Sequence, residues 1–477
     1  MSTYISRSVD MKLNYKRTIL VGFAFFLISA FWQAYDAIVP LILTNHFGLT
    51  QEWSGIVMSF DNILAVFMLP LFGSLSDRVD SRFGKRKPFI FFGTIAAVVC
   101  FVALTLVDNY QLARLSLTSI PADAALAGTD EAALEAVLAR TLGITMANPL
   151  PLVIFIGVLL LTLIAMATYR SPAVALMPDV TVKPLRSKGN AIINLMGAAG
   201  GVTVLVLGMV FATSKNKHME YTGYVLCVCA IMVLAFVVFM LTVKEKKWAD
   251  EMEETTARLG LEEKSDENVG VKGAKLGRGE FRSLMLILAS VALWYVGYNS
   301  ITSKYSVYAT NILGFDYNLT LIIAQAAAIV SYIPVGIVAS KIGRKKTILA
   351  GIVLLASAFF IGNFITSSTP EAVMYPVFIL AGIGWATINV NSFPMVVELA
   401  KSGDVGKYTG YYYTASMSAQ IVAPILSGFL YKISMRAFFF SFGTLFVALS
   451  FLTMLFVKHG DSKPEKQSAL DSLGADD

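Results

Sequence analysis

The sequence has few charged residues and almost no cysteine or histidine. Only 15% of its 477 residues are Asp, Glu, Lys or Arg, against about 25% in an ordinary soluble domain. Hydrophobic residues make up 56% of the chain, and the mean hydropathy is +0.67. This composition excludes a soluble enzyme, a disordered chain and a disulfide scaffold. Cys100, Cys227 and Cys229 all lie in apolar runs, which indicates core packing and not a zinc site or disulfide framework.

Two further absences narrow the class of protein. The sequence has no phosphate-binding loop of the form G-x-x-x-x-G-K-[ST], which argues against an ATP-driven pump. Its three histidines, His46, His218 and His459, fall outside the long apolar runs, so we expect no histidine relay at membrane depth. Without a histidine cluster or a nucleophile–base pair in those runs, we expect no enzyme, no cofactor and no metal site.

The long apolar runs predict membrane-spanning helices, because a span needs about 20 mostly apolar residues. Twelve such runs are present, at 18–44, 52–76, 88–108, 150–177, 188–213, 220–243, 283–308, 317–340, 346–366, 372–397, 406–431 and 436–457. The polar stretch 244–282 divides them into six and six. The sequence therefore predicts an all-α membrane protein with a tail at 1–17, a six-helix bundle at 18–243, a linker at 244–282, a second bundle at 283–457 and a tail at 458–477.

The basic residues predict the orientation. With the N-terminus in the cytoplasm, 30 of the 38 Lys and Arg residues fall in cytoplasmic segments, six in outer loops and two, Arg170 and Lys304, within spans. This bias follows the positive-inside rule. We therefore expect a multi-pass protein of the cell membrane, in a bacterium the inner membrane, with both termini in the cytoplasm. It also means that the net charge of +6 calls for no nucleic-acid partner.

Two long joints interrupt the pattern of short loops. In the extracytoplasmic loop 109–149, Leu134, Val137, Leu138 and Thr141 follow helical spacing after the start signal Gly128–Asp130. This spacing favours a short amphipathic helix on the outer face, with a disordered loop as the alternative. The linker 244–282 mixes Lys, Glu and Gly and is typical of a solvated, partly helical tether.

The loops after spans 2 and 8 form an internal repeat. The first reads Gly-Ser-Leu-Ser-Asp-Arg-Val-Asp-Ser-Arg-Phe-Gly-Lys-Arg-Lys-Pro over 73–88, and the second reads Gly-Ile-Val-Ala-Ser-Lys-Ile-Gly-Arg-Lys-Lys over 336–346. The two copies are offset by 263 residues. Parallel repeats in corresponding places of two six-span halves are related by an axis along the membrane normal.

This repeat resembles motif A of the major facilitator superfamily. Its expanded form, D-R-x-x-S-R-x-G-x-R-x-P, looks like that of the sucrose–proton symporters and the related glycoside–pentoside–hexuronide cation symporters. The stretch 170–179, continuing through 186–191, also looks like the span 4–5 region of that group. The resemblance implies a major facilitator fold, twelve helices around a central cavity, and secondary transport. The chain departs from the plant sucrose symporters because 161–168, the middle of span 4, lacks a carboxylate.

The basic loop after span 2 is a candidate gate. A carboxylate at the end of a span can pair with cations on neighbouring helices in one conformation and release them in another. We expect Asp77 to reach Arg186 or a nearby helix N-terminus. Arg78, Arg82 and Arg86 complete the candidate set, the alternative being that these cations only enforce topology.

Three ionisable residues at membrane depth are candidate coupling sites, because such residues are costly in hydrocarbon and usually functional. Asp36 and Asp61 fall at similar depths, about 12–13 Å from the outer ends of spans 1 and 2 at 1.5 Å per residue. We expect Asp61 or Asp36 to carry the coupling proton, and Asp36 is also a candidate substrate ligand. Local hydrogen bonding, for instance to Asn62, is the alternative for both. Arg170 in span 4 is expected to pair with a carboxylate or substrate, or else to extend towards the membrane surface.

The candidate substrate residues are amides, a carboxylate and an aromatic ring, which suit the hydroxyl edges and flat C–H faces of sugars. The predicted substrate set is Gln33, Asp36, Arg170, Asn299, Trp385 and Asn389.

These features, with the resemblance, predict proton-coupled uptake of a disaccharide or α-glucoside such as sucrose or maltose. A sodium-coupled glycoside symporter is the first alternative, since paired carboxylates also ligate a cation. Efflux of amphipathic compounds and sensing of sugar without transport are weaker alternatives. The expected partners are a small sugar, the lipid bilayer and no second subunit.

Overall fold

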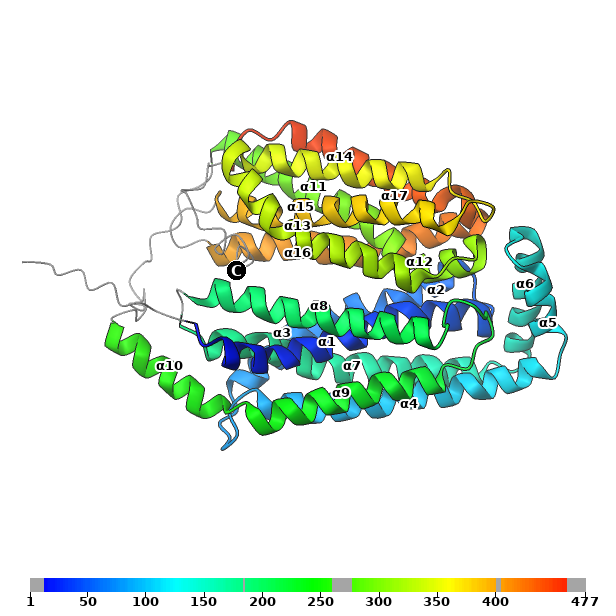
Figure 1. Ribbon diagram of the computed structural model, residues 1–477, viewed down its shortest axis with the longest axis horizontal. Helices are drawn as coiled ribbons and strands as arrows, with labels where there is room; N and C mark the ends of the chain where they lie inside the picture. Colours follow the sequence, from blue (N-terminus) through cyan, green and yellow to red (C-terminus); the bar gives the residue numbers. More distant parts are fainter. Residues whose placement is uncertain (1–12, 183–184, 260–276, 400–404, 461–477) are drawn as a thin grey trace, which may run out of the picture.

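The computed structural model describes residues 13–182, 185–259, 277–399 and 405–460, and these residues form helices and connecting turns without strands. The long helices run side by side in two layers (Figure 1). The expected tails at 1–17 and 458–477 fall largely outside the described residues, as does 260–276 of the expected linker.

The first layer contains the helices of the first half of the chain. They are α1 (Tyr15–Leu41) with the π-helical turn η1 (Ile42–His46), α2 (Gln51–Met58), α3 (Phe60–Asp77), α4 (Lys87–Ser116), α7 (Leu150–Asp179), α8 (Arg186–Val210) and α9 (Thr222–Thr242).

The second layer repeats this arrangement. Its helices are α11 (Arg278–Thr302), α12 (Tyr305–Val307) with the π-helical turn η3 (Tyr308–Leu313), α13 (Tyr317–Ile342), α14 (Arg344–Gly362), the 3-10 turn η4 (Glu371–Val373) with α15 (Met374–Val397), α16 (Val405–Ile433) and α17 (Met435–Leu455).

Eleven helical segments of the described residues are long and apolar enough to cross a membrane. The predicted span at 406–431 is not among these eleven segments. It corresponds to α16, which has 29 residues but a sequence rich in Tyr, Ser, Thr and Gly. Several helices are apolar around most of their circumference, with exposed side chains such as Phe67, Phe92 and Leu234, as expected of helices that face lipid. The chain is thus an all-α, multi-pass membrane protein.

The ends of the helices are defined by local sequence. The side chain of Asn14 accepts a hydrogen bond from the Arg17 backbone N–H and so caps α1. Proline occupies the first turn of α4 and of α7, where its missing N–H has no partner to lose. These caps let each helix begin at the edge of an apolar run.

The first of the two long joints is more helical than the sequence predicts. α4 continues to Ser116, and α5 (Ile120–Ala127) and α6 (Glu131–Ala147) occupy most of 109–149. The amphipathic helix expected there is present as α6, which buries Leu134, Val137 and Thr141. The described part of the linker is helical, as the expected partly helical tether allows, because α10 (Glu245–Leu259) begins directly after α9 and α11 already begins at Arg278.

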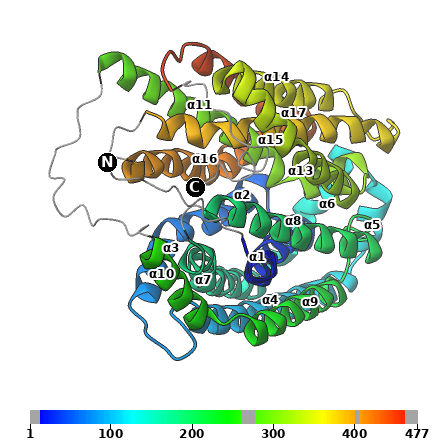
Figure 2. The ribbon, with the colours of Figure 1, turned by 60° about the vertical axis from the view of Figure 1, so that its left-hand side comes forward.

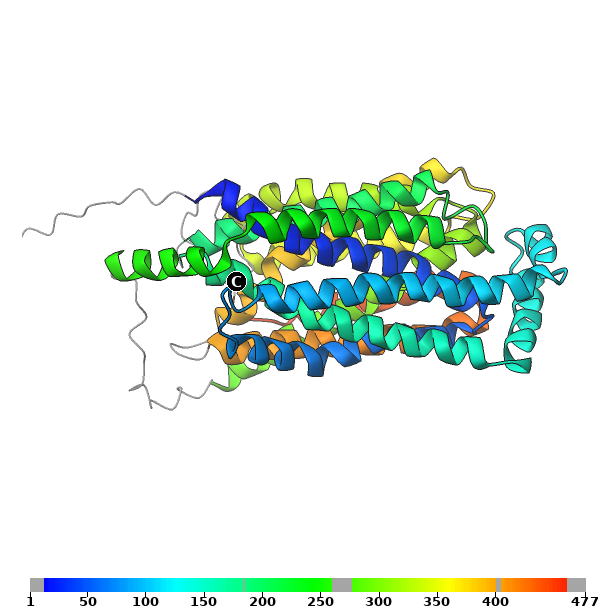
Figure 3. The same cartoon turned by 90° about the horizontal axis from the view of Figure 1, so that it is seen from below.

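The two ends of the molecule are easily told apart. α10 and the start of α1 lie at one end, which we call the termini end, and α5 and α6 lie across the other, which we call the cap end (Figure 3). The two halves meet through α2 against α16 and α8 against α13, and Figure 2 shows these helices along the boundary between the layers. The functional site lies along this boundary.

Candidate functional site

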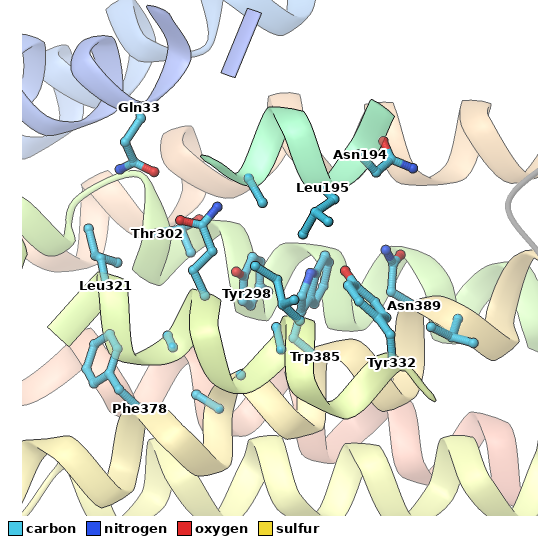
Figure 4. A pocket seen from close by; sticks show the side chains of 18 of the residues that line it. Gln33, Asn194, Leu195, Tyr298, Thr302, Leu321, Tyr332, Phe378, Trp385 and Asn389 are labelled. Atoms are coloured by element: carbon cyan, nitrogen blue, oxygen red, sulfur yellow. The ribbon is translucent and has the colours of Figure 1, made fainter. Parts of the chain in front are cut away.

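A cavity of about 690 Å³ lies between the two halves, within the usual range of about 300–1,000 Å³ for small-molecule sites. α8 and Gln33 of α1 line it on one side, and α11, α13 and α15 line it on the other (Figure 4). It extends to Tyr15, the first residue of α1. The cavity therefore reaches towards the termini end.

The cap end is closed between the same two halves. The amide groups of Asn45 and Asn311 hydrogen-bond each other there, and the buried ammonium group of Lys304 donates a hydrogen bond to the Ser54 hydroxyl. The described conformation is therefore closed at the cap end, with its cavity directed towards the termini end.

The cavity wall combines an aromatic pair with amides. The rings of Tyr298 and Trp385 stack with centroids 3.8 Å apart and planes 10° apart, and Asn389 lies one turn from Trp385 on α15. Gln33 enters from the opposite side, and Gln325 comes from α13 (Figure 4 labels Gln33). Among the described residues, the lining includes no Asp, Glu, Lys or Arg. A neutral molecule with hydroxyl groups and a flat apolar face fits this chemistry.

The structure places three of the six predicted substrate residues on the cavity, namely Gln33, Trp385 and Asn389. Asn299 is a correction: its side-chain amide donates to the Tyr295 carbonyl of its own helix at 2.8 Å, and it is not part of the lining. The offset of 263 residues aligned it with Asp36, but the lining positions on α11 are Tyr298, Ile301 and Thr302.

Asp36, Asp61 and Arg170 gather in the first half, beside the cavity lining. The three groups lie within electrostatic range of one another, and the Arg170 guanidinium lies 5.4 Å from the ring centroid of Trp32. Asp36 is exposed although Tyr35 and Ala37 on either side are buried, so its carboxylate faces a solvent-accessible space. Arg170 thus lies near both carboxylates, while the roles of the three residues in coupling and substrate binding stay predictions.

Asp61 also has local partners. Its carboxylate accepts hydrogen bonds from the Asn62 backbone N–H at 2.6 Å and from the Asn62 side-chain amide at 2.8 Å. Three buried polar groups lie close in sequence to Asp36 and Arg170 and have no hydrogen-bond partner among the described residues. They are the Trp32 Nε1, the Tyr35 hydroxyl and the Tyr169 hydroxyl. Unpaired buried polar atoms call for ordered water, so we expect water molecules beside these three groups.

The candidate gate is centred on Arg86, whose side chain is 7% exposed. Its guanidinium pairs with Asp77 at 2.6 Å and with Asp179 at 2.7 Å, and it donates to the Ser76 hydroxyl. It thereby joins the ends of α3 and α7 to the start of α4. Asp77 therefore pairs with Arg86 in the described conformation, whereas the sequence predicts Arg186 or a nearby helix N-terminus as its partner.

The remaining candidate gate residues lie apart from this centre. Arg186 donates to the carbonyls of Thr181 at 3.2 Å and Pro178 at 3.1 Å, and so stabilises the end of α7. Arg82 lies over the ring of Phe83 at 4.7 Å. Arg78 is exposed.

Glu245 is a structural residue of the same region that the sequence did not single out. Its buried carboxylate accepts the backbone N–H groups of Arg86 and Lys87, both at 2.8 Å, and so caps α4 from α10. The Lys87 ammonium donates to the carbonyls of Met240 and Val243 at the end of α9. Burial raises the pKa of Glu245, although the N–H groups that it accepts oppose the shift.

A buried histidine is a second residue that the sequence prediction missed. His46, expected in a loop, is fully buried, and its Nδ1 lies 2.6 Å from Oδ1 of the equally buried Asp108. The His46 Nε2 lies 3.1 Å from the Lys217 carbonyl oxygen. The apolar run of span 1 stops just before His46, and only the continuation of α1 into η1 buries the ring.

Comparison with known families identifies the class of protein. The family model described as the Major Facilitator Superfamily matches residues 132–333 and 316–475, which together exceed half of the chain. The model described as MFS/sugar transport protein matches residues 20–126. The chain therefore belongs to the major facilitator superfamily, and it is a membrane transporter and not an enzyme.

Individual relatives are more distant. An uncharacterized MFS-type transporter of Methanocaldococcus jannaschii is 31% identical over 130 residues, which cover 26% of this chain and 30% of the relative.

Solved structures match over a greater length. The inward-open xylose transporter XylE from E. coli matches with a TM-score of 0.63 and 16% identity, covering 97% of this chain and 99% of the other. A bacterial homologue of the iron transporter ferroportin, in an inward-facing state, matches with a TM-score of 0.61 and 13% identity. This match covers 93% of this chain and 99% of the other. At these identities the likeness shows the fold alone.

Proposed function

We propose that the protein imports a neutral disaccharide or α-glucoside together with a proton, by alternating access. This proposal rests on one observation: the neutral polar and aromatic residues of the cavity are separate from the charged residues beside it. The described residues that line the substrate cavity offer aromatic rings and amides and no charged side chain, while Asp36, Asp61 and Arg170 gather beside the cavity in the first half. The family match to sugar transporters supports the same reading.

The aromatic pair and the amides have distinct tasks in this proposal. The stacked rings of Tyr298 and Trp385 offer a flat platform for the C–H face of a sugar ring. Gln33, Gln325 and Asn389 each offer one acceptor and two donor hydrogens to sugar hydroxyls. Because Gln33 belongs to the first half and the others to the second, substrate binding contacts both halves, as alternating access requires.

We propose that the carboxylates couple the proton to this movement. Asp61 is the first choice and Asp36 the second. A carboxylate that must be neutral in a closed site and charged in a hydrated one ties proton release to the conformational change. Asn resembles protonated Asp in shape but cannot release a proton. Asp61→Asn should therefore lose accumulation driven by a pH gradient and keep exchange of internal for external sugar.

The test uses purified protein in proteoliposomes with labelled sucrose, maltose and a simple α-glucoside. Net uptake driven by an inward pH gradient, and absent with a sodium gradient alone, supports the proposal. Uptake that follows the sodium gradient favours the sodium-coupled alternative. Binding of sugar, measured by a thermal shift, without any net uptake would favour the sensor. Asp80→Asn, whose parent side chain is 88% exposed, is the matched control and should transport normally.

The test of Asp36 has two outcomes. Asp36→Asn should behave like Asp61→Asn if Asp36 carries the coupling proton, and should lose sugar binding if Asp36 holds a sugar hydroxyl. Full proton-driven accumulation by both variants would contradict the proposed coupling site.

We also propose that the termini end faces the cytoplasm, on the basis of the basic residues around Arg86, and that Asp77 acts in gating through its pair with Arg86. An impermeant cysteine reagent tests the orientation. Labelling of Ala127→Cys in intact cells, with Gly270→Cys labelled only after permeabilisation, is expected; the reverse pattern would overturn it. Unchanged transport kinetics in Asp77→Asn would contradict the gating role and indicate that the basic loop only sets the membrane topology.

A further inference from the structure

A short sequence repeat lies at the cap end, away from the cavity and from the basic loop around Arg86. Span 1 ends in Thr-Asn-His-Phe-Gly over 44–48, and span 7 ends in Thr-Asn-Ile-Leu-Gly over 310–314. Both copies have the form Thr-Asn-x-x-Gly, and they are offset by 266 residues, close to the offset of the basic loops. The two copies therefore occupy corresponding places in the two halves.

The repeat has the same backbone conformation in both halves. Each copy lies at a π-helical turn, η1 or η3. Each ends in a glycine with a left-handed conformation, φ +68° at Gly48 and +74° at Gly314, which a side chain would disfavour. The residue after each glycine donates its backbone N–H to a carbonyl six positions earlier, at 2.9 Å in both copies. The repeated sequence therefore forms the same local structure in both halves.

The two asparagines of the repeat meet across the boundary between the halves. The Asn311 amide donates to the Asn45 carbonyl oxygen at 2.7 Å, and the Asn45 amide donates to the Asn311 carbonyl oxygen at 3.3 Å. Both side chains are buried, with 1% and 2% exposed. The neighbouring hydroxyls of Thr44 and Thr310 are buried without a hydrogen-bond partner among the described residues. The pairing places one copy of the repeat directly against the other.

We propose that Asn45 and Asn311 form the gate that closes the cap end of the transport path. Each amide donates to the carbonyl oxygen of the other, so these two hydrogen bonds exist only while the two halves touch. When the cap end opens, water must replace these bonds. The pair therefore favours the closed conformation by holding two buried amides that neither half can satisfy alone. This proposal rests on the proposed transport cycle, because the amide pair closes the cap end in one step of that cycle.

Other contacts at the cap end are weaker candidates for this role. The Glu52–Lys432 pair, at 2.9 Å, also joins the halves, but the lysine side chain is 51% exposed, and exposed ion pairs contribute little. Lys304 and Ser54 do join the halves in a buried site, but an ammonium group buried with a hydroxyl partner loses hydration that one hydroxyl does not replace. The amide pair is the neutral, reciprocal contact.

α6 and the turn before it cover both copies of the repeat. A Cβ atom at Gly48 would lie 2.4 Å from the Leu142 backbone nitrogen of α6, and one at Gly314 would lie 3.3 Å from Thr129. Glu131, the first residue of α6, accepts hydrogen bonds from the Ser434 hydroxyl and the Arg436 backbone N–H of the second half. Opening the gate must therefore also release α6 from the second half.

The test follows access to the cavity and needs no substrate. In the full chain, Cys100, Cys227 and Cys229 are replaced by Ala, and Thr302→Cys, on the cavity lining, becomes the only thiol. A membrane-impermeant maleimide is added to vesicles of either orientation, so that labelling from the cap end is separated from labelling from the termini end. The gate variants are Asn45→Leu, Asn311→Leu and the double variant, each checked for folding by size-exclusion chromatography and thermal unfolding.

Each single leucine variant leaves one buried amide without a partner, and we expect labelling from the cap end to become about 10-fold faster. In the double variant no amide remains, and replacing both partners by apolar groups of similar size is nearly neutral. Its labelling rate should return to within about 2-fold of the parent rate. Asn45→Gln keeps both the donor and the acceptor on a longer side chain, so its labelling rate should lie between those of the parent and the leucine variant, and it serves if a leucine variant does not fold.

Asn109→Ala is the matched control, since this amide bonds to Glu220 and Thr222 within the first half and should leave labelling from the cap end unchanged. Unchanged labelling in both single variants would overturn the proposal, as would a double variant that opens as far as the two single effects combined. Failure of sugar uptake in the parent protein, with the expected labelling pattern intact, would contradict the proposed substrate and leave the gate standing.

Discussion

Replacement of the two carboxylates that hold Arg86 provides the sharpest prediction about the basic loop. Asp179→Asn and Asp77→Asn each remove one charge from the same guanidinium, which is 7% exposed. The Arg86–Asp179 distance is 2.7 Å and the Arg86–Asp77 distance is 2.6 Å, so geometry alone does not rank them. Burial does, because the Asp179 side chain is 34% exposed and that of Asp77 is 62% exposed.

The expected magnitudes follow from this difference in exposure. A hydrogen bond to a charged group contributes about 1.5–3 kcal/mol when buried, and partial exposure of Asp179 reduces this to about 1–2 kcal/mol. An ion pair with an exposed partner contributes about 0–1 kcal/mol, which is our expectation for Asp77. A difference of 1.4 kcal/mol changes an equilibrium constant by about 10-fold. Asp179→Asn should therefore loosen the junction of α3, α4 and α7 far more than Asp77→Asn.

Hydrogen exchange of the first turn of α4, residues 87–92, measures this loosening in the full chain. We expect exchange about 10-fold faster in Asp179→Asn, less than about 3-fold faster in Asp77→Asn, and no change in the exposed control Asp80→Asn. Exchange in Asp77→Asn that equals or exceeds that in Asp179→Asn would refute the reasoning from burial. Slower transport in Asp77→Asn with unchanged exchange would support a role for this pair in the conformational change.

Three further predictions concern other parts of the molecule. Glu245→Ala leaves two N–H groups of α4 without their acceptor and should weaken the first turn of α4 by about 2–4 kcal/mol. Hydrogen exchange over 87–92 measures this effect, and Glu253→Ala, at an exposed position, is the control. Equal exchange rates in the two variants would contradict the prediction. Trp385→Ala, which removes one ring of the stacked pair, should weaken sugar binding by about 1–3 kcal/mol while Trp385→Phe retains most of it, as measured by thermal shift; equal binding in both variants would contradict the platform. Burial lowers the pKa of Lys217 to about 8, below the 10.5 of an exposed lysine. Between pH 8 and 10.5 the unfolded state therefore holds more protons, and the cap end should become more stable as pH rises. Protection factors over 211–221, which correct the exchange rates for their intrinsic rise with pH, should increase in this range and not in Lys217→Met; protection factors that fall would contradict the prediction.

The sequence located the candidate residues better than it located their partners. Gln33, Trp385 and Asn389 were predicted from residue type, and all three line the cavity. Asn299 was predicted from the repeat offset, but a shift of one residue on a helix turns a side chain by about 100°, and its amide instead bonds to its own helix. Asp77 was correctly placed at the end of a span, but its partner depends on how the loop after α3 turns, and the loop brings Arg86 to it.

Residues that act through tertiary contacts were missed. Glu245 is one of several acidic residues in a charged stretch, and nothing in the sequence separates it from Glu253 or Glu254. Only the docking of α10 against the start of α4 buries its carboxylate. His46 was placed in a loop because the apolar run ends before it, and the π-helical turn that follows α1 buries it against Asp108.

By itself, the sequence determined the class of protein, the number of its spans and the two-fold repetition of its halves. These features follow from local physics, because a long apolar run has to form a helix in a bilayer whatever its neighbours are. Tertiary structure alone decided which end is closed, which residues face the cavity and which polar groups pair across the halves. The Thr-Asn-x-x-Gly repeat illustrates the division: its letters stand in the sequence, but the bond between Asn45 and Asn311 exists only because the fold brings positions 266 residues apart into contact.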